Sequence, residues 1–147
     1  MKHIIEFEKL FEHNLNDTYC MLKPSNLHGV GVFAIRNIPI NINPLGKENL
    51  EDWEQLEPDE YEKLPNEIKY VIKTYSVKQN GKYWIPKYGF HQKIGLANFL
   101  NHSNDPNIIS INNGEEFKTI KEIKTGEELL IDYNSLGEEE SEDFLKI

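Results

Sequence analysis

The chain has 147 residues, of which 38% are hydrophobic and 11% aromatic, and this length and composition suit one folded domain and exclude a disordered chain. A net charge of −9 argues against nucleic acid as a direct ligand, because phosphate binding requires basic patches. The acidity suits a cationic partner such as a lysine-rich protein tail, although solubility alone also explains it.

We expect residues 1–18 to form an N-terminal extension, with a short strand or helical turn at 4–15. This segment lacks the long apolar centre of a signal peptide, and no stretch approaches the run of about 18 apolar residues that a membrane helix needs. The sequence therefore predicts an intracellular protein, cytoplasmic or associated with the nucleus or nucleoid, with no membrane contact. Cys20, the single cysteine, lies in an apolar run and is predicted to be a buried structural thiol.

Short strands are predicted to follow the extension. Residues 18–23 and 31–36 are extended apolar segments. Residues 38–42 alternate apolar and polar side chains around a proline, which is typical of an edge strand.

A helical insert is predicted at about 48–73, between two groups of strands. Leu50, Trp53 and Leu56 repeat at the helical spacing of three. Two prolines each precede acidic residues, as at the first turns of helices. These prolines are Pro58 and Pro65. The insert is therefore expected to contain two short helices.

Strands resume after the insert and are separated by tight turns. The predicted strands are 74–78, 83–85, 107–111, 116–120 and 129–133. Asn80-Gly81 and Asn113-Gly114 each indicate a hairpin turn. Residues 135–147 form an acidic C-terminal tail. The predicted fold class is mostly β with a short helical insert.

A first motif, LHGVGVF at 27–33, places Gly29 and Gly31 one residue apart. Two such glycines let the backbone approach a ligand closely and expose its amide groups. The motif is not a dinucleotide fingerprint, because the third glycine is missing. Taken alone, it is better explained as a plain turn before a strand.

A second motif, NFLNHSNDPN at 98–107, gathers side chains that donate and accept hydrogen bonds in fixed directions. Its alternatives are a turn, a metal site with poor ligands and a serine–histidine pair, which adjacent side chains on a strand disfavour. A third motif, GEELLIDY at 126–133, reads alone as a turn and a buried strand that ends in a polar pair.

Together and in this order, the three motifs resemble the SET-domain methyltransferases, whose pattern is a GxG loop, then NHSxxPN, then GEELxxDY. FKTIKEI at 117–123 resembles the family's strand and turn before the last motif. The resemblance implies a SET domain at 19–134. Such a domain is a mostly β, β-clip-like fold of several small sheets with a C-terminal pseudoknot, in which the NHS segment is threaded under the loop that carries the DY strand.

The resemblance also implies the chemistry, because family members transfer a methyl group from S-adenosylmethionine to a lysine side chain. We therefore expect this cofactor and a lysine-containing protein or peptide substrate, such as a basic, histone-like tail. The residues implied to bind the cofactor are His28, Gly29, Val30, Gly31, Asn101, His102 and Tyr133. The residues implied to be catalytic are Tyr133 and, as a second channel tyrosine, Tyr75. Its competitors are Tyr70, Tyr83 and Trp84, with core packing as the alternative for each.

The chain departs from the family pattern at three positions. Asn98 replaces a frequent arginine, and Asn104 replaces a cysteine that binds zinc with a C-terminal cysteine cluster in many members. Because that cysteine and its cluster are both missing, we predict no metal. Phe144 and Leu145 of the tail are expected to complete the substrate channel instead. Ile131 stands where the family often has Phe or Tyr. Because isoleucine holds no water through a hydroxyl, more than one methyl group per lysine is predicted.

Two alternatives belong to other functional classes. One is a catalytically silent SET-like module that recruits a basic partner through its acidic surface, and the other is a structural protein such as a β-clip adaptor. The intact Asn101, His102 and Tyr133 favour the enzyme. Acidic residues of the insert are expected to select a lysine-rich tail. They are Glu51, Asp52, Glu54, Glu57, Asp59 and Glu60.

Overall fold

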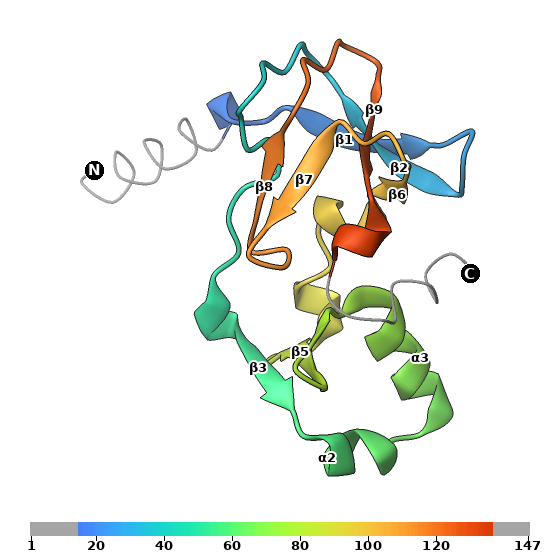
Figure 1. The fold of residues 1–147 in the computed structure, drawn as a ribbon. Coiled ribbons are helices and arrows are strands. Elements are labelled where there is room, and N and C mark those ends of the chain that lie inside the picture. Colours follow the sequence, from blue (N-terminus) through green and yellow to red (C-terminus); the bar gives the residue numbers. More distant parts are fainter. Residues whose placement is uncertain (1–14, 137–147) are drawn as a thin grey trace, which may run out of the picture.

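The computed structural model describes residues 15–136 as three small sheets with a few short helices (Figure 1). The largest sheet has the strand order β1 (Cys20–Pro24), β2 (Val30–Ala34), β9 (Glu128–Ile131) and β6 (Asn101–His102). The second has the order β3 (Trp53–Leu56), β5 (Lys82–Pro86) and β4 (Lys78–Gln79), and the third pairs β7 (Ile108–Ile111) with β8 (Glu116–Thr119). The predicted mostly β class is confirmed.

The helices are short, and all but the last lie between strands. They are α2 (Pro58–Glu62), α3 (Asn66–Tyr75) and the 3-10 turns η1 (Leu50–Asp52), η2 (Phe90–Gln92), η3 (Leu96–Phe99) and η4 (Tyr133–Ser135). The longest of these described helices, α3, has 10 residues, and none is long and apolar enough to cross a membrane. The element predicted at 4–15 lies, except for its last residue, outside the described part of the chain.

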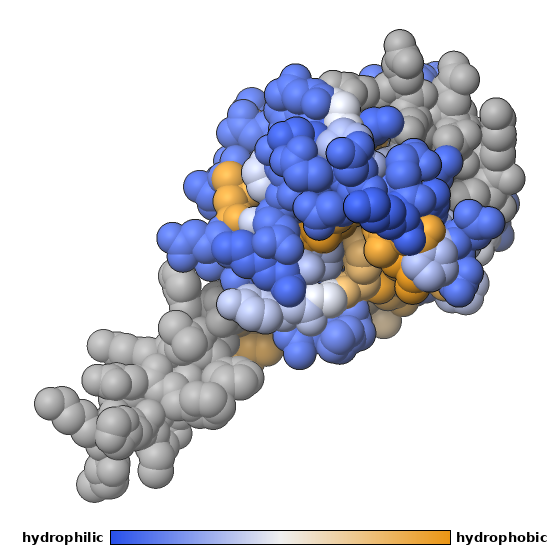
Figure 2. All heavy atoms as spheres, turned by 90° about the horizontal axis from the view of Figure 1, so that it is seen from below, coloured by the Kyte–Doolittle hydropathy of each residue, from blue (hydrophilic) through white to orange (hydrophobic). Residues whose placement is uncertain are grey.

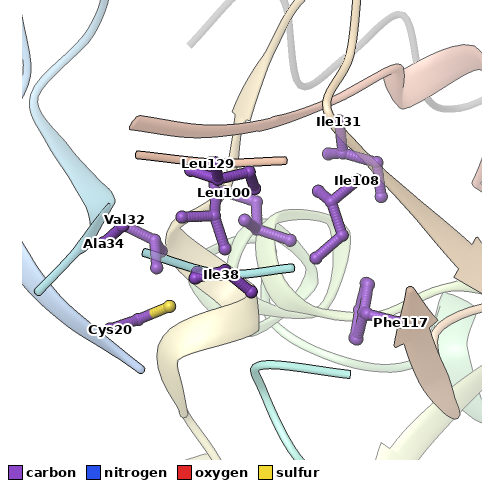
Figure 3. Packing of buried hydrophobic residues seen from close by; sticks show 10 residues of the cluster. Cys20, Val32, Ala34, Ile38, Leu100, Ile108, Phe117, Leu129 and Ile131 are labelled. Carbon is purple, nitrogen blue, oxygen red and sulfur yellow. The ribbon is translucent and has the colours of Figure 1, made fainter. Parts of the chain in front are cut away.

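The main hydrophobic core is organised around β9. Strand β2 lies between β1 and β9, with Val32 opposite Leu129. Both side chains are fully buried, and Leu129 belongs to the same buried cluster as Leu100 and Ile38 (Figure 3). Burial of each such side chain stabilises the fold by about 1.5–3 kcal/mol. The core therefore fixes β9, whose two ends carry the polar residues of the third motif.

The edge strand predicted at 38–42 is wrong. The segment forms a single β-bridge, between Ile38 and Ile123, and isolated backbone hydrogen bonds join Asn41 and Ile42 to Thr119. Pro39 has no N–H with which to extend a ladder, and Asn41 adopts a φ of 66°, which belongs to a turn. The alternation of side chains along this segment therefore does not reflect a strand.

The insert forms a lobe at one end of the molecule (Figure 1, green). Its two predicted helices are confirmed as α2 and α3, each preceded or begun by a proline. The helical reading of 50–56 is wrong, because one 3-10 turn leads into β3, which pairs with β5. Asn49 caps that single turn. Leu56 is buried with Ile72 and Tyr83 in a second small core, so packing against β5 outweighs the helical spacing.

The strand predicted at 74–78 is largely wrong, because α3 continues to Tyr75 and β4 is limited to Lys78–Gln79. The N–H of Ser76 donates to the carbonyl of Ile72 at 2.9 Å and closes the last turn of α3. The hairpin turn at Asn80-Gly81 is confirmed, with positive φ angles of 54° and 77°. The hairpin of β7 and β8 is confirmed in the same way.

Cys20 is buried in the main core, as predicted. Burial raises the pKa of its thiol from 9.0 to about 11, because a charged thiolate is poorly solvated there. The neutral thiol is therefore favoured in the folded state, so this stability is fully present below pH 9 and is lost as the pH rises toward 11. We expect the free energy of unfolding to fall by on the order of 2 kcal/mol over this range.

Denaturant unfolding at several pH values checks this prediction. In Cys20→Ala the free energy of unfolding should be lower at neutral pH, because a buried side chain is truncated. Its decline between pH 9 and 11 should be shallower than that of the wild type. Equal slopes for the two proteins would show that the thiol does not titrate in the folded state as proposed.

Candidate active site

Two segments that are far apart in the sequence lie side by side. Strand β6 pairs in parallel with β9, with Asn101 opposite Leu130. Further along, Asn107 holds β9 through two hydrogen bonds: its Nδ2 donates to the carbonyl of Glu128 at 2.9 Å, and its Oδ1 accepts from the N–H of Leu130 at 2.8 Å. The second and third motifs therefore meet. The threading of the chain implied by the resemblance stays a prediction.

Asn101 holds the loop of the first motif. Its side chain is 5% exposed, and Nδ2 donates to the carbonyl of His28 at 3.0 Å and to that of Val30 at 3.4 Å. His28, Gly29 and Val30 are exposed, and Gly29 has a φ of 46° with open space beside it. The structure therefore brings Asn101 together with the glycine loop, which presents exposed backbone.

Glu128 joins the same group, although the motif gave it no specific role. Its Oε1 accepts from Nδ2 of Asn101 at 2.7 Å, and its Oε2 accepts from the hydroxyl of Ser25 at 2.9 Å. A Cβ atom on Gly31 would lie 2.0 Å from Oε1, so only glycine fits there without displacing the carboxylate. The sequence signal that could have identified Glu128 is a charged residue at the start of an otherwise apolar strand.

His102 uses both ring nitrogens within the protein. Nδ1 lies 3.0 Å from the N–H of Tyr133, which can only donate, so Nδ1 accepts. The proton therefore lies on Nε2, which donates to Oδ1 of Asn104 at 3.0 Å. In this neutral form, the approach of Nδ1 to Asp132 at 3.7 Å is not an ion pair. His102 positions the backbone of Tyr133, and a contact between His102 and a cofactor would not use these two nitrogens.

Tyr133 follows β9 and begins η4. Its hydroxyl donates to the carbonyl of Leu100 at 2.5 Å, and its ring lies 5.2 Å from that of His102. Burial raises the pKa of Tyr133, and the negative charge of Glu128 adds to the effect. Tyr133 is therefore a neutral hydroxyl whose direction is set by its hydrogen bond to Leu100.

A cavity of about 540 Å³ opens beside Tyr133. Leu100, Ile131 and Tyr133 line it from the main core, and Tyr75 of α3 and Trp84 of β5 line it from the other side. On the face shown in Figure 2, apolar residues lie recessed between polar ones. The cavity is therefore partly open and largely apolar, with the hydroxyl of Tyr133 and charged side chains such as Lys73 and Glu115 in its lining.

The glycine loop and Asn101 do not line this cavity. Tyr133 does, while its backbone is held by His102. Tyr133 therefore lies between the cavity and the residues around the glycine loop. This arrangement is compatible with a cofactor and a substrate that approach from different sides.

Tyr75 lies at the end of α3, not on the strand that the sequence predicted. It still reaches the cavity, as do its competitors Tyr83 and Trp84. The side chain of Tyr83 is 4% exposed and packs in the second small core with Leu56 and Ile72. Tyr70 is 55% exposed and does not line the cavity. Tyr75 therefore lines the cavity and Tyr70 does not, while the channel role of Tyr75 stays a prediction.

The acidic residues expected to select a basic tail do not line the cavity. Two of them have lysine partners in the protein: Asp52 with Lys93 at 2.7 Å and Glu57 with Lys82 at 2.9 Å. Such exposed pairs contribute little to stability, but they reduce the negative field that a substrate would meet. Selection by this cluster stays a prediction.

Within residues 15–136, no group of three potential His, Cys, Asp or Glu ligands could hold a metal ion. The prediction that Phe144 and Leu145 complete the channel concerns residues outside the described range. Leu136, near the end of that range, lines the cavity.

The family model described as SET domain matches residues 29–134. A curated relative, the histone-lysine N-methyltransferase, H3 lysine-37 specific, of Schizosaccharomyces pombe, is 32% identical over 120 residues, which cover 76% of this chain and 71% of the relative. These two matches support each other, because both cover most of the chain.

Solved structures show the same fold. A candidate histone methyltransferase of Plasmodium falciparum has a TM-score of 0.50 and 20% identity, over 80% of this chain and 94% of its own. The Chaetomium thermophilum Polycomb Repressive Complex 2 bound to S-adenosylmethionine has a TM-score of 0.57 and 23% identity, over 88% of this chain and 17% of its own. The fold of small sheets predicted from the three motifs is confirmed.

Proposed function

The chain belongs to the SET-domain family, and from this premise we propose that it is an S-adenosylmethionine-dependent protein-lysine N-methyltransferase. Its proposed substrate is a lysine in a basic, histone-like protein tail, as the name of the Schizosaccharomyces pombe relative suggests. The observation that carries the proposal is the placement of Tyr133. Its neutral, oriented hydroxyl lies in the wall of an apolar cavity and beside the group around Asn101 and His102.

The residues around the glycine loop fit the proposed cofactor, which has an amino acid part and an adenosine part. Oδ1 of Asn101 has no hydrogen-bond partner among the described residues and can accept from an ammonium group. Leu27 and Val30, 60% and 43% exposed, offer apolar surface to adenosine. When bound, S-adenosylmethionine supplies a methyl group on a positively charged sulfur. We propose that His28, Gly29, Val30, Gly31, Asn101 and His102 hold it beside Tyr133.

The cavity suits the other reactant, a lysine side chain. A free lysine has a pKa of about 10.4, so only about one in a thousand is neutral at pH 7.4. The apolar lining lowers that pKa by desolvation, and a nearby positive charge lowers it further. The hydroxyl oxygen of Tyr133 can then accept a hydrogen bond from the neutral amine and orient it, and Tyr75 lines the same wall. Positioning of this kind is the main contribution of the protein to the reaction rate.

Ile131 supports transfer of more than one methyl group to a lysine. It is fully buried and lines the cavity, where its apolar side chain leaves no hydroxyl to hold a water molecule in the space of an added methyl group. Mass spectrometry of the product should detect dimethyl- or trimethyl-lysine. A product that stays monomethylated at long reaction times would contradict this prediction.

Titration calorimetry with S-adenosylmethionine tests the proposal against its main alternative, a catalytically silent binding module. The enzyme should bind the cofactor, and Asn101→Ala should weaken that binding. A folded wild-type protein that binds no S-adenosylmethionine at millimolar concentration would instead support the silent module. Circular dichroism of both proteins controls for folding.

A further inference from the structure

We propose that Glu128 is a positioning residue that sets the orientation of the Asn101 side-chain amide and ties it to the glycine loop. This inference rests on the proposed function, because it concerns how the chain prepares its cofactor site. Glu128 lies at the start of β9, which the main core holds in place. Its carboxylate is therefore a fixed point from which both neighbours can be aligned.

The first part of the inference concerns the amide of Asn101. A side-chain amide has nearly the same shape in its two flipped orientations, so its hydrogen-bond partners decide which one is adopted. An ionised carboxylate can only accept, so the 2.7 Å contact with Glu128 requires the nitrogen Nδ2 at that position. The carbonyls of His28 and Val30 also accept from Nδ2. All three partners of Asn101 therefore favour the same orientation of its amide, with Nδ2 toward them.

This orientation leaves Oδ1 of Asn101 for a ligand. The buried side-chain atoms without a hydrogen-bond partner in the described structure are the hydroxyls of Ser76 and Tyr83. Because Oδ1 of Asn101 is not among them and has no partner, it retains access to solvent although the residue is 5% exposed. An oriented acceptor of this kind suits a cationic ammonium group.

The second part concerns the loop that follows β1. The hydroxyl of Ser25 donates to Oε2 of Glu128 at 2.9 Å and accepts from the N–H of Leu27 at 3.0 Å. The N–H of Ser25 donates to the carbonyl of Gly29 at 2.8 Å, which closes the loop. Oε1 of Glu128 therefore accepts from the Asn101 amide, and Oε2 accepts from Ser25 of the loop.

Glu128→Gln tests this role, because it preserves shape while adding an N–H₂ group that lets the Asn101 amide turn over. We expect the dissociation constant for S-adenosylmethionine to rise about tenfold, as for the loss of a hydrogen bond to a charged group. The kcat at saturating cofactor should change by less than about threefold, because Glu128 acts through Asn101 and not on the reacting atoms. Glu127→Gln, its exposed neighbour, removes the same charge and should bind the cofactor as the wild type does.

A double-mutant cycle separates positioning from a general structural role. If Glu128 acts through Asn101, adding Glu128→Gln to Asn101→Ala should weaken cofactor binding by less than twofold beyond the single change. Hydrogen exchange of the amides of 26–31 in the cofactor-free protein gives a second readout. It should be faster in Glu128→Gln than in Glu127→Gln, because the tie through Ser25 is weakened.

Wild-type cofactor affinity together with wild-type loop exchange in Glu128→Gln would overturn the inference, as would a fully additive cycle. If circular dichroism shows that Glu128→Gln does not fold, Ser25→Ala takes its place in both measurements and should weaken binding severalfold. A wild-type protein that binds no S-adenosylmethionine would instead refute the proposed function. In that case the exchange comparison still decides whether Glu128 holds the loop.

Discussion

Tyr133→Phe is expected to lower kcat for lysine methylation by on the order of 100-fold, because catalysis here depends on positioning. The substitution removes the hydroxyl that donates to Leu100 and that we propose orients the lysine amine. The affinity for S-adenosylmethionine should change little, since the backbone contact with His102 remains. Steady-state kinetics with a radiolabelled methyl donor measures both quantities. Tyr88→Phe, at a tyrosine that is 69% exposed, is the matched control and should keep wild-type turnover.

The pH profile of the same two proteins separates orientation from base catalysis. Because the pKa of Tyr133 is raised above its ordinary value, its hydroxyl stays protonated while the substrate lysine loses its proton. Turnover of the wild type should therefore rise from pH 7 to 9, and Tyr133→Phe should show the same slope at a lower rate. A mutant whose residual rate no longer depends on pH would mean that Tyr133 itself removes the proton.

Gly31→Ala is expected to weaken binding of S-adenosylmethionine strongly. The added Cβ would meet Oε1 of Glu128 at 2.0 Å and Nδ2 of Asn101 at 3.1 Å, so the loop, the carboxylate or the amide has to move. Overpacking of this kind lowers stability by about 1–3 kcal/mol. Because it also displaces the amide of Asn101, we expect the dissociation constant to rise by about tenfold or more, as for the loss of a hydrogen bond to a charged group. Calorimetry with the folded variant measures the effect.

Gly95→Ala is the matched control for Gly31→Ala. Gly95 has a φ of −119°, and its added Cβ would meet no atom within 4 Å. It should bind S-adenosylmethionine with wild-type affinity. Equal affinities for the two variants and the wild type would show that close approach at Gly31 does not support the cofactor site.

Local patterns predicted much of the fold, and the failures share a cause. The Asn-Gly turn at Asn80 and the proline starts of α2 and α3 depend on backbone chemistry, and these predictions hold. Leu50 to Leu56 failed because pairing with β5 overrides the spacing of side chains. The segment at 38–42 failed because the chain turns at Asn41, where the N–H of Asn41 donates to the carbonyl of Thr119 at 2.9 Å. Tertiary contacts decided both cases, and a local pattern carries no record of them.

At the candidate site too, the sequence motifs predicted residues but not the tertiary contacts between them. The order of the three motifs pointed to Asn101, His102 and Tyr133, and the structure brings them together. The order of the motifs did not predict that both nitrogens of His102 are used within the protein, nor that Glu128 reaches Asn101. These contacts depend on the register of β6 against β9. Tyr75 was placed on a strand and lies instead at the end of a helix, although it still lines the cavity.

Methyl transfer itself is the most direct test of the central claim. Purified protein, S-adenosylmethionine with a radiolabelled methyl group, and histone H3 or a cell lysate should give labelled protein, and mass spectrometry should locate the label on lysine side chains. Tyr133→Phe should reduce the label to near background under the same conditions. If the folded wild-type protein binds the cofactor but labels no lysine in either substrate, the proposal that this SET domain is a lysine methyltransferase acting on histone-like tails is contradicted.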